Sequence, residues 1–239
     1  MPDNIQPKVN TASQLVCAWS SPAATVMWLV GFLALAGFVP PLSPDADALT
    51  IAAYYKENNL GVLAGLWFTM MGAALIGPFM VAISIQLKRI EGTNCPMTYG
   101  NLGLGMLMIL LFVMPCFLLG TAAFRPDRDP QLIMLMNDAG WLPFVGGFHC
   151  TFIQVLMIAF CILKDKEQKI LPRWLGYFNV WIAILLLPSA LVLFIKTGPF
   201  AWDGEMAFWL VLTIFCGWFL IMFWEIRKAI LRQAAGTTL

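Results

Sequence analysis

His149 is the chain's one histidine, and it lies in the stretch GGFHCTFIQ a short distance before Gln154. A single imidazole in an apolar helix can hydrogen-bond to a neighbouring helix, line a ligand cavity or act as one axial ligand of haem. Centres that need several histidines, such as di-iron and multi-imidazole copper sites, cannot form within one chain. We therefore expect His149 to make a polar contact, with haem at His149 as the cofactor alternative.

Two aspartate pairs offer the other candidate chemistry, each within a Pro-Asp-x-Asp motif. Carboxylates two residues apart can supply oxygen ligands to Ca²⁺, but neither motif continues into a complete calcium-binding loop. The same aspartates can cap helix N-termini and pair with nearby arginines. We expect caps and local ion pairs around a polar surface, and we assign no metal site. The residues concerned are Asp45, Asp47, Asp127, Asp129, Arg125 and Arg128.

Each motif also predicts the start of a short helix. Ser43 is expected to cap a helix with Pro44 at its first position, and Asp129 one with Pro130 there. A largely apolar stretch follows each motif. The chain then passes through an Asn-containing break that ends in glycine before the next long apolar run; in the second case this glycine is Gly140. The sequence thus predicts two related short helices that cover the bundle or gate something beneath them.

The composition indicates which elements must position these residues. The chain has 239 residues, of which 60% are hydrophobic and 11% charged, with a mean hydropathy of +0.80. Soluble domains are about a quarter charged, so the lipid bilayer is the expected solvent. Ten tryptophans, many near the ends of apolar runs, fit interfacial belts. A net charge of +1 shows no nucleic-acid footprint, and the apolar composition predicts membrane lipid as a partner.

The hydropathy pattern predicts an all-α bundle of six transmembrane helices with short interfacial helices in the outer loops. We expect an N-terminal arm at 1–21, a six-helix domain at 22–224 and a C-terminal tail at 225–239. Pro22 after two serines is interpreted as the start of the first span, and Pro172 as the boundary before the fifth. The predicted spans are 22–40, 60–87, 99–122, 142–163, 175–195 and 206–224.

The distribution of basic residues predicts the orientation. Most Lys and Arg residues lie in the N-terminal arm, in the 88–98 and 164–174 loops and in the tail, whereas most acids lie in the other loops. The positive-inside rule then places both termini in the cytoplasm. The six cysteines form no CxxC motif, so we expect no disulfide framework.

Prolines and polar residues within the spans are candidates for a cavity. A proline frees a backbone carbonyl and can kink its helix, although membrane helices also tolerate such kinks without any function. Polar side chains nearby can line a cavity or simply join helices by hydrogen bonds. The ligand-cavity candidates are His149, Gln154, Thr151, Asn179, Pro78, Pro115 and Pro188.

Two segments near the end of the chain carry a family resemblance. LPRWLGYFNVW at 171–181 and KTGPFAWDGEMAFW at 196–209 resemble segments of uncharacterised bacterial multi-pass membrane proteins with domains of unknown function. The resemblance implies a bacterial inner-membrane protein and brings no activity with it.

The absence of reaction motifs orders the functional hypotheses. The sequence contains no P-loop, GxSxG or HExxH motif, and no acidic or basic residue at the middle of a predicted span. We expect a non-catalytic binding or accessory subunit of a membrane assembly, either self-associated as a homo-oligomer or joined to other membrane subunits. The alternatives are a transporter or channel for a small neutral or apolar solute, and an intramembrane enzyme acting on a lipophilic substrate.

Overall fold

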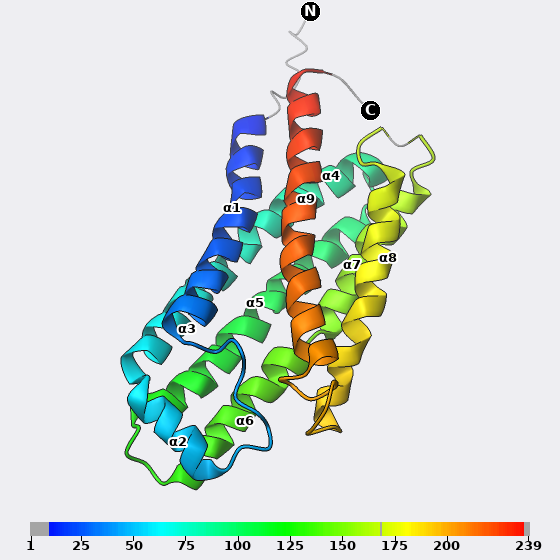
Figure 1. Cartoon of the computed structure of the whole chain (residues 1–239). Helices are drawn as coiled ribbons and strands as arrows, with labels where there is room; N and C mark the ends of the chain where they lie inside the picture. The colour runs from blue at the N-terminus through cyan, green and yellow to red at the C-terminus, as the bar shows by residue number, and fades with distance from the viewer. Residues whose placement is uncertain (1–9, 168, 237–239) are drawn as a thin grey trace, which may run out of the picture.

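The structure, a computed structural model, describes residues 10–167 and 169–236, which are all-α without any strand (Figure 1). Six helical segments are long and apolar enough to cross a membrane, which confirms the predicted fold class. The elements are α1 Thr11–Leu29, η1 Val30–Leu35, α2 Ala48–Glu57, α3 Asn59–Ala74, α4 Ile76–Glu91, α5 Pro96–Phe124, α6 Pro130–Gly146, α7 His149–Lys164, α8 Arg173–Leu186, η2 Leu187–Leu193, η3 Glu205–Trp209 and α9 Leu210–Ala234.

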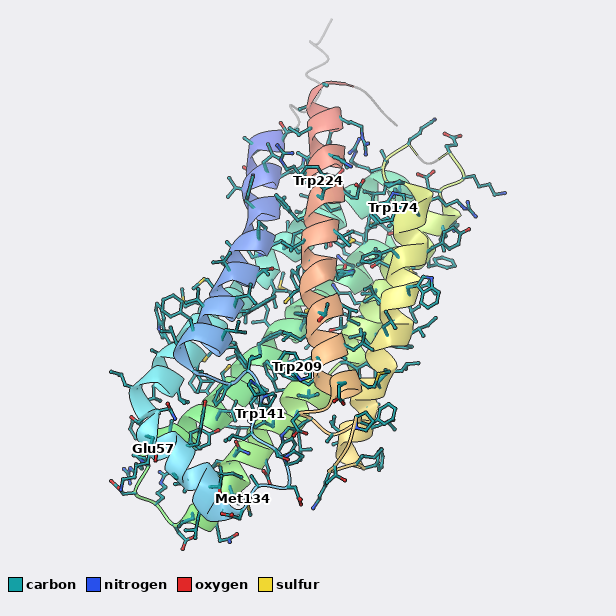
Figure 2. All side chains as sticks on the ribbon, viewed as in Figure 1. Glu57, Met134, Trp141, Trp174, Trp209 and Trp224 are labelled. Atoms are coloured by element: carbon teal, nitrogen blue, oxygen red, sulfur yellow. The ribbon has the colours of Figure 1, made fainter. Side chains whose placement is uncertain are left out.

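The six spans build one bundle whose two ends differ. Helix α1 begins and α9 ends at one end, which we call the terminal end, while α2 and the start of α6 lie at the other, the distal end (Figure 1). Figure 2 shows Trp174 and Trp224 toward the terminal end and Trp209 nearer the distal end, with about half of the Trp174 and Trp224 surfaces exposed. This separation fits the predicted interfacial belts. The orientation of either end toward the cytoplasm stays a prediction.

The first span begins well before Pro22, which corrects the predicted boundary. Helix α1 starts at Thr11, where the Asn10 side chain accepts a hydrogen bond from the Ser13 amide, and Pro22 lies inside the helix. The polar residues of 10–21 lengthen the helix because they find partners on other helices. The Gln14 side-chain oxygen accepts from Gln86 Nε2 at 2.7 Å, and Ser21 Oγ donates to the Phe219 carbonyl at 2.8 Å.

The short helix predicted in the first distal loop exists, but it starts later than expected. Residues around Ser43 form a turn in which the Ser43 carbonyl accepts from the Ala46 amide, so α2 begins at Ala48. Asp47 is its cap and accepts from the Thr50 amide at 2.9 Å. Two hydrogen bonds from Thr50, the backbone one being the stronger influence, lower the pKa of Asp47. Pro172 is confirmed as the residue before α8.

The second short helix is not separate from span four. Asp129 caps α6 with Pro130 at its start, as predicted, but the helix then runs through Gly140 to Gly146. The expected break at Asn137–Gly140 does not occur because both ends of that stretch are packed. Asn137 accepts a hydrogen bond from the Tyr55 hydroxyl at 3.0 Å. A side chain at Gly140 would meet Leu119 of α5 at 2.6 Å.

The related distal segments do pack against each other. Helix α2 lies along the first half of α6 (Figure 1), and the buried side chains of Ile51, Tyr55 and Ile133 join one apolar cluster there. Among the residues that the structure describes, Arg125 and Arg128 form no ion pair with the neighbouring aspartates: Asp127 pairs with Lys56 of α2 at 2.8 Å, and Arg128 donates to the Thr121 carbonyl at 3.1 Å. Packing between elements thus gives these charged side chains partners other than the neighbouring charges that the sequence predicted.

Candidate functional site

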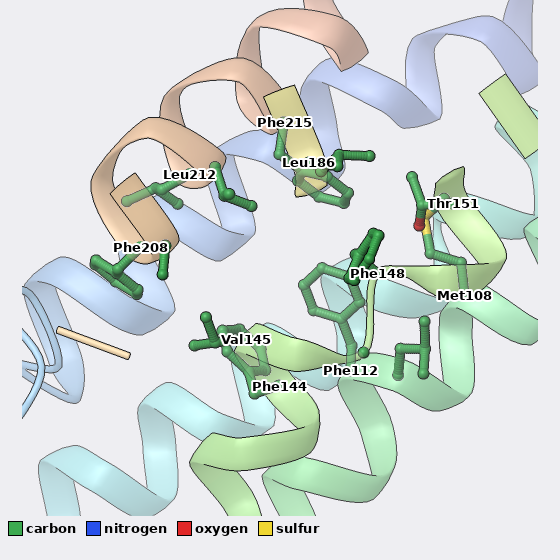
Figure 3. A pocket seen from close by; sticks show the side chains of 14 residues that line it. Met108, Phe112, Phe144, Val145, Phe148, Thr151, Leu186, Phe208, Leu212 and Phe215 are labelled. Atoms are coloured by element: carbon green, nitrogen blue, oxygen red, sulfur yellow. The ribbon is translucent and has the colours of Figure 1, made fainter. Parts of the chain in front are cut away.

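The principal cavity lies among spans three to six and has a volume of about 100 Å³. Figure 3 shows Phe208, Leu212 and Phe215, from η3 and α9, across the cavity from Phe144 and Phe148. Apolar cavities of this order of size hold small apolar ligands; one of ~150 Å³ accepts benzene. Its lining is Met108, Leu111, Phe112, Phe144, Val145, Gly147, Phe148, Thr151, Leu186, Ala207, Phe208, Val211, Leu212 and Phe215.

Three spans leave regular α-helical geometry at the cavity. Span four breaks at Gly147, between α6 and α7, where a Cβ atom would lie 2.3 Å from the Pro143 carbonyl oxygen. Span five changes to the 3₁₀ segment η2 directly after Leu186, and span six starts as the π-helical segment η3. Such segments shift side chains relative to a straight helix and are frequent at functional sites. Here they frame the cavity.

A second, smaller cavity of about 50 Å³ adjoins the first. The two share Phe112, Phe144, Phe208, Leu212 and Phe215, so aromatic rings form the partition. The Phe112 ring lies 5.5 Å from Phe144 and 5.6 Å from Phe215, between ring centroids. The second cavity also reaches Leu29, Leu33 and Cys216, on η1 and the neighbouring turns of α1 and α9.

Thr151 supplies the polar side chain of the principal cavity. It is 5% exposed, and within the described part of the chain its hydroxyl makes no hydrogen bond. Helical threonines commonly donate to the carbonyl four residues earlier, as Thr69 does to Gly65 and Thr213 to Trp209. For Thr151 that carbonyl belongs to Gly147, which lies in the break before α7. The break therefore leaves the hydroxyl available to a ligand.

The structure places His149 and Gln154 apart from this cavity. His149 is the first residue of α7, its side chain is exposed, and its ring stacks on Phe148 at 4.5 Å between centroids. Gln154 is fully buried in a polar network between α4, α5 and α7. Its Nε2 donates to Asn101 Oδ1 at 3.0 Å, and Asn101 Nδ2 donates to Ser84 Oγ at 2.9 Å. Haem at His149 stays a prediction.

The other predicted cavity residues lie outside the lining of the principal cavity. Asn179 is buried and accepts from Trp218 Nε1 at 2.9 Å, which joins α8 to α9. Pro78 is exposed just after the break between α3 and α4, Pro115 is buried within α5, and Pro188 lies in η2. Among the described residues, only Thr151 of the predicted set lines the principal cavity.

The distal charged residues form caps and exposed contacts. Asp47 and Asp129 cap α2 and α6, whereas Asp45 and Arg125 are exposed in the loops. Hydrogen bonding by Asp127 raises the pKa of Lys56. In the described part of the chain, no three His, Cys, Asp or Glu side chains gather as a metal site would require.

Sequence reasoning missed the cavity because phenylalanine and leucine carry no chemical signature in an apolar span. The available signal was the Pro143 to Gly147 stretch, where a proline and two glycines interrupt span four.

The fold and site define a polytopic α-helical membrane protein with an apolar cavity in its membrane-spanning part. No protein-family model, no curated protein and no solved structure matches the chain.

Proposed function

We propose that this protein is a non-catalytic membrane component that binds an apolar ligand in the principal cavity. The observation that carries the proposal is the cavity itself, a partly open pocket of about 100 Å³ lined by aromatic and aliphatic side chains. Among the described residues that line it there is no Asp, Glu, Lys, Arg or His. The lining thus offers close packing and one hydroxyl, which suits binding better than acid–base chemistry or ion passage.

Close packing within the cavity can favour the transfer of a ligand from the lipid into the protein. Lipid tails are as apolar as leucine, so moving an apolar ligand from lipid into protein gains little from hydrophobic transfer alone. Where an apolar pocket is left unfilled, however, the atoms that line it lose van der Waals contacts. A ligand that fills the cavity recovers those lost contacts.

Photolabelling tests this proposal. The purified protein in detergent micelles is incubated with a long-chain alkane carrying a diazirine, irradiated, and digested for mass spectrometry. We expect adducts on peptides that contain Phe144–Phe148 and Phe208–Phe215. Val211→Phe, which fills the cavity from α9, should remove most of this labelling, and Ala207→Leu gives a second way to fill it.

Leu220→Phe is the matched control, because Leu220 lies on the same helix but is 45% exposed. It should leave the labelling of the cavity peptides intact. Unchanged labelling in folded Val211→Phe and Ala207→Leu proteins would overturn the proposal, since labels would then reflect lipid-facing surface.

A further inference from the structure

The second cavity extends the binding site toward the surrounding lipid. Leu29 and Leu33 line it, and they are 42% and 49% exposed within the first membrane-spanning segment. Helices α1 and α9 diverge from the terminal end toward the distal end (Figure 1), and residues of both line this cavity. An exposed surface in such a segment faces lipid chains, so the second cavity is positioned to receive one.

The aromatic partition between the two cavities consists of side chains and not of backbone. Phe112, Phe144 and Phe215 belong to both linings, and Phe112 also stacks on Trp28, with 5.0 Å between ring centroids and an interplanar angle of 8°. Rotation of side chains is much faster than movement of helices. A flexible chain can therefore pass between the cavities when these rings rotate, without any separation of the spans.

The two ends of this path differ in polarity. In the second cavity the Thr69 hydroxyl is already bonded to the Gly65 carbonyl at 2.9 Å. The Trp28 indole N–H, also on a lining residue, has no partner among the described residues, but it is buried against Gly72 and not accessible to a ligand. In the principal cavity Thr151 is the polar side chain of the lining, the residue as a whole is 5% exposed, and its hydroxyl is unbonded within the described residues. A ligand group that bonds to this hydroxyl gains affinity from one net hydrogen bond within an otherwise apolar lining.

We infer that the ligand is a neutral single-chain lipid with one hydroxyl or carbonyl group, bound with that group at Thr151 and its chain directed past Phe112 through the second cavity, with the rest of the chain in the surrounding lipid beyond Leu29 and Leu33. This inference rests on the proposed function and adds the ligand's class and orientation. A charged headgroup does not fit, because the described linings of both cavities hold no Asp, Glu, Lys, Arg or His to pair with it.

The test compares a long-chain alcohol with the alkane of the same length, both carrying the same diazirine. Competition with unlabelled ligand gives an apparent affinity for each. Wild-type protein should prefer the alcohol by roughly fivefold, the ratio expected from one net hydrogen bond. Thr151→Val, which keeps the shape of the side chain, should abolish the preference while leaving alkane binding unchanged. Thr151→Ser should retain the preference.

The second cavity is tested with Cys216→Phe, which narrows it from α9. This variant should weaken binding of the long-chain alcohol more than binding of a short-chain alcohol. Equal weakening would overturn the assigned path of the chain.

The outcomes separate this inference from the proposed function. If Val211→Phe leaves the binding of both probes unchanged, the proposed function fails. If Val211→Phe weakens both but Thr151→Val keeps the wild-type preference for the alcohol, only the inferred ligand class fails. Loss of alcohol and alkane binding to the same extent in Thr151→Val would also overturn the assigned role of the hydroxyl.

Discussion

Replacing Asn101 by Leu tests whether a buried polar network holds α4, α5 and α7 together. Asn101 is fully buried, accepts from Gln154 Nε2 and donates to Ser84 Oγ. The network continues toward the terminal end, where Ser84 Oγ donates to the Thr98 carbonyl at 3.4 Å. Asn101→Leu removes the two short bonds and leaves Gln154 Nε2 with the Met80 Sδ, a weak acceptor, at 2.8 Å.

The size of the effect depends on the groups left without partners. Hydrogen bonds between membrane helices average only about 0.6 kcal/mol in double-mutant cycles. Leaving a buried partner unsatisfied costs about 1–3 kcal/mol. Gln154 has 0% exposure, and its Oε1 already lacks a partner in the described structure, so neither water nor lipid headgroups can relieve the loss. We expect Asn101→Leu to lower the free energy of unfolding by about 2–3 kcal/mol.

A double-mutant cycle isolates the interaction. Gln154→Leu alone should cost about 1 kcal/mol, and the double variant should cost less than the two single changes together by about 1–2 kcal/mol, because no amide is then left unpaired. Unfolding in detergent micelles is followed by circular dichroism. Thr213→Val is the control, because the Thr213 hydroxyl donates only to the Trp209 carbonyl, four residues earlier in the same span. Strictly additive costs would refute the reasoning.

Three further predictions concern packing, pH and surface charge. Gly65→Ala should lower the free energy of unfolding by about 1–3 kcal/mol, because the added Cβ would lie 2.4 Å from the Gly31 carbonyl oxygen. Gly103→Ala is the control and should leave stability unchanged, because no atom lies within 4 Å of its added Cβ. Equal melting temperatures for the two variants would contradict this prediction. The ionised Asp47 cap should make its full contribution to the free energy of unfolding above its ordinary pKa of 3.8, and this contribution should disappear as the pH falls through the lower pKa of the folded protein. Asp47→Asn should remove this pH dependence of unfolding. Lys56→Gln should leave the melting temperature at physiological salt unchanged, because its pair with Asp127 is exposed, and a clear loss would show that the pair matters.

The path from sequence to fold was most reliable where one property dominated. Long apolar runs require helices in a membrane, since only closed hydrogen bonding satisfies the backbone there, and this predicted all six spans. The Asp129–Pro130 cap was also predictable, because capping is a local interaction. Boundaries failed where distant partners intervened: Gln86 and Phe219 stabilise polar turns of α1, and Tyr55 bonds to Asn137 inside α6.

The candidate site shows still more clearly which features the sequence determines and which depend on tertiary packing. The sequence by itself determined the solvent, the number of spans and which residues are polar enough to attract attention, because these follow from composition and spacing. Only the tertiary structure decided that Gln154 is bonded within the core, that His149 faces outward and that Thr151 lines the principal cavity. The physical reason is that a cavity is a space left between helices, and its shape depends on breaks such as Gly147 and on the rotation of each helix about its axis.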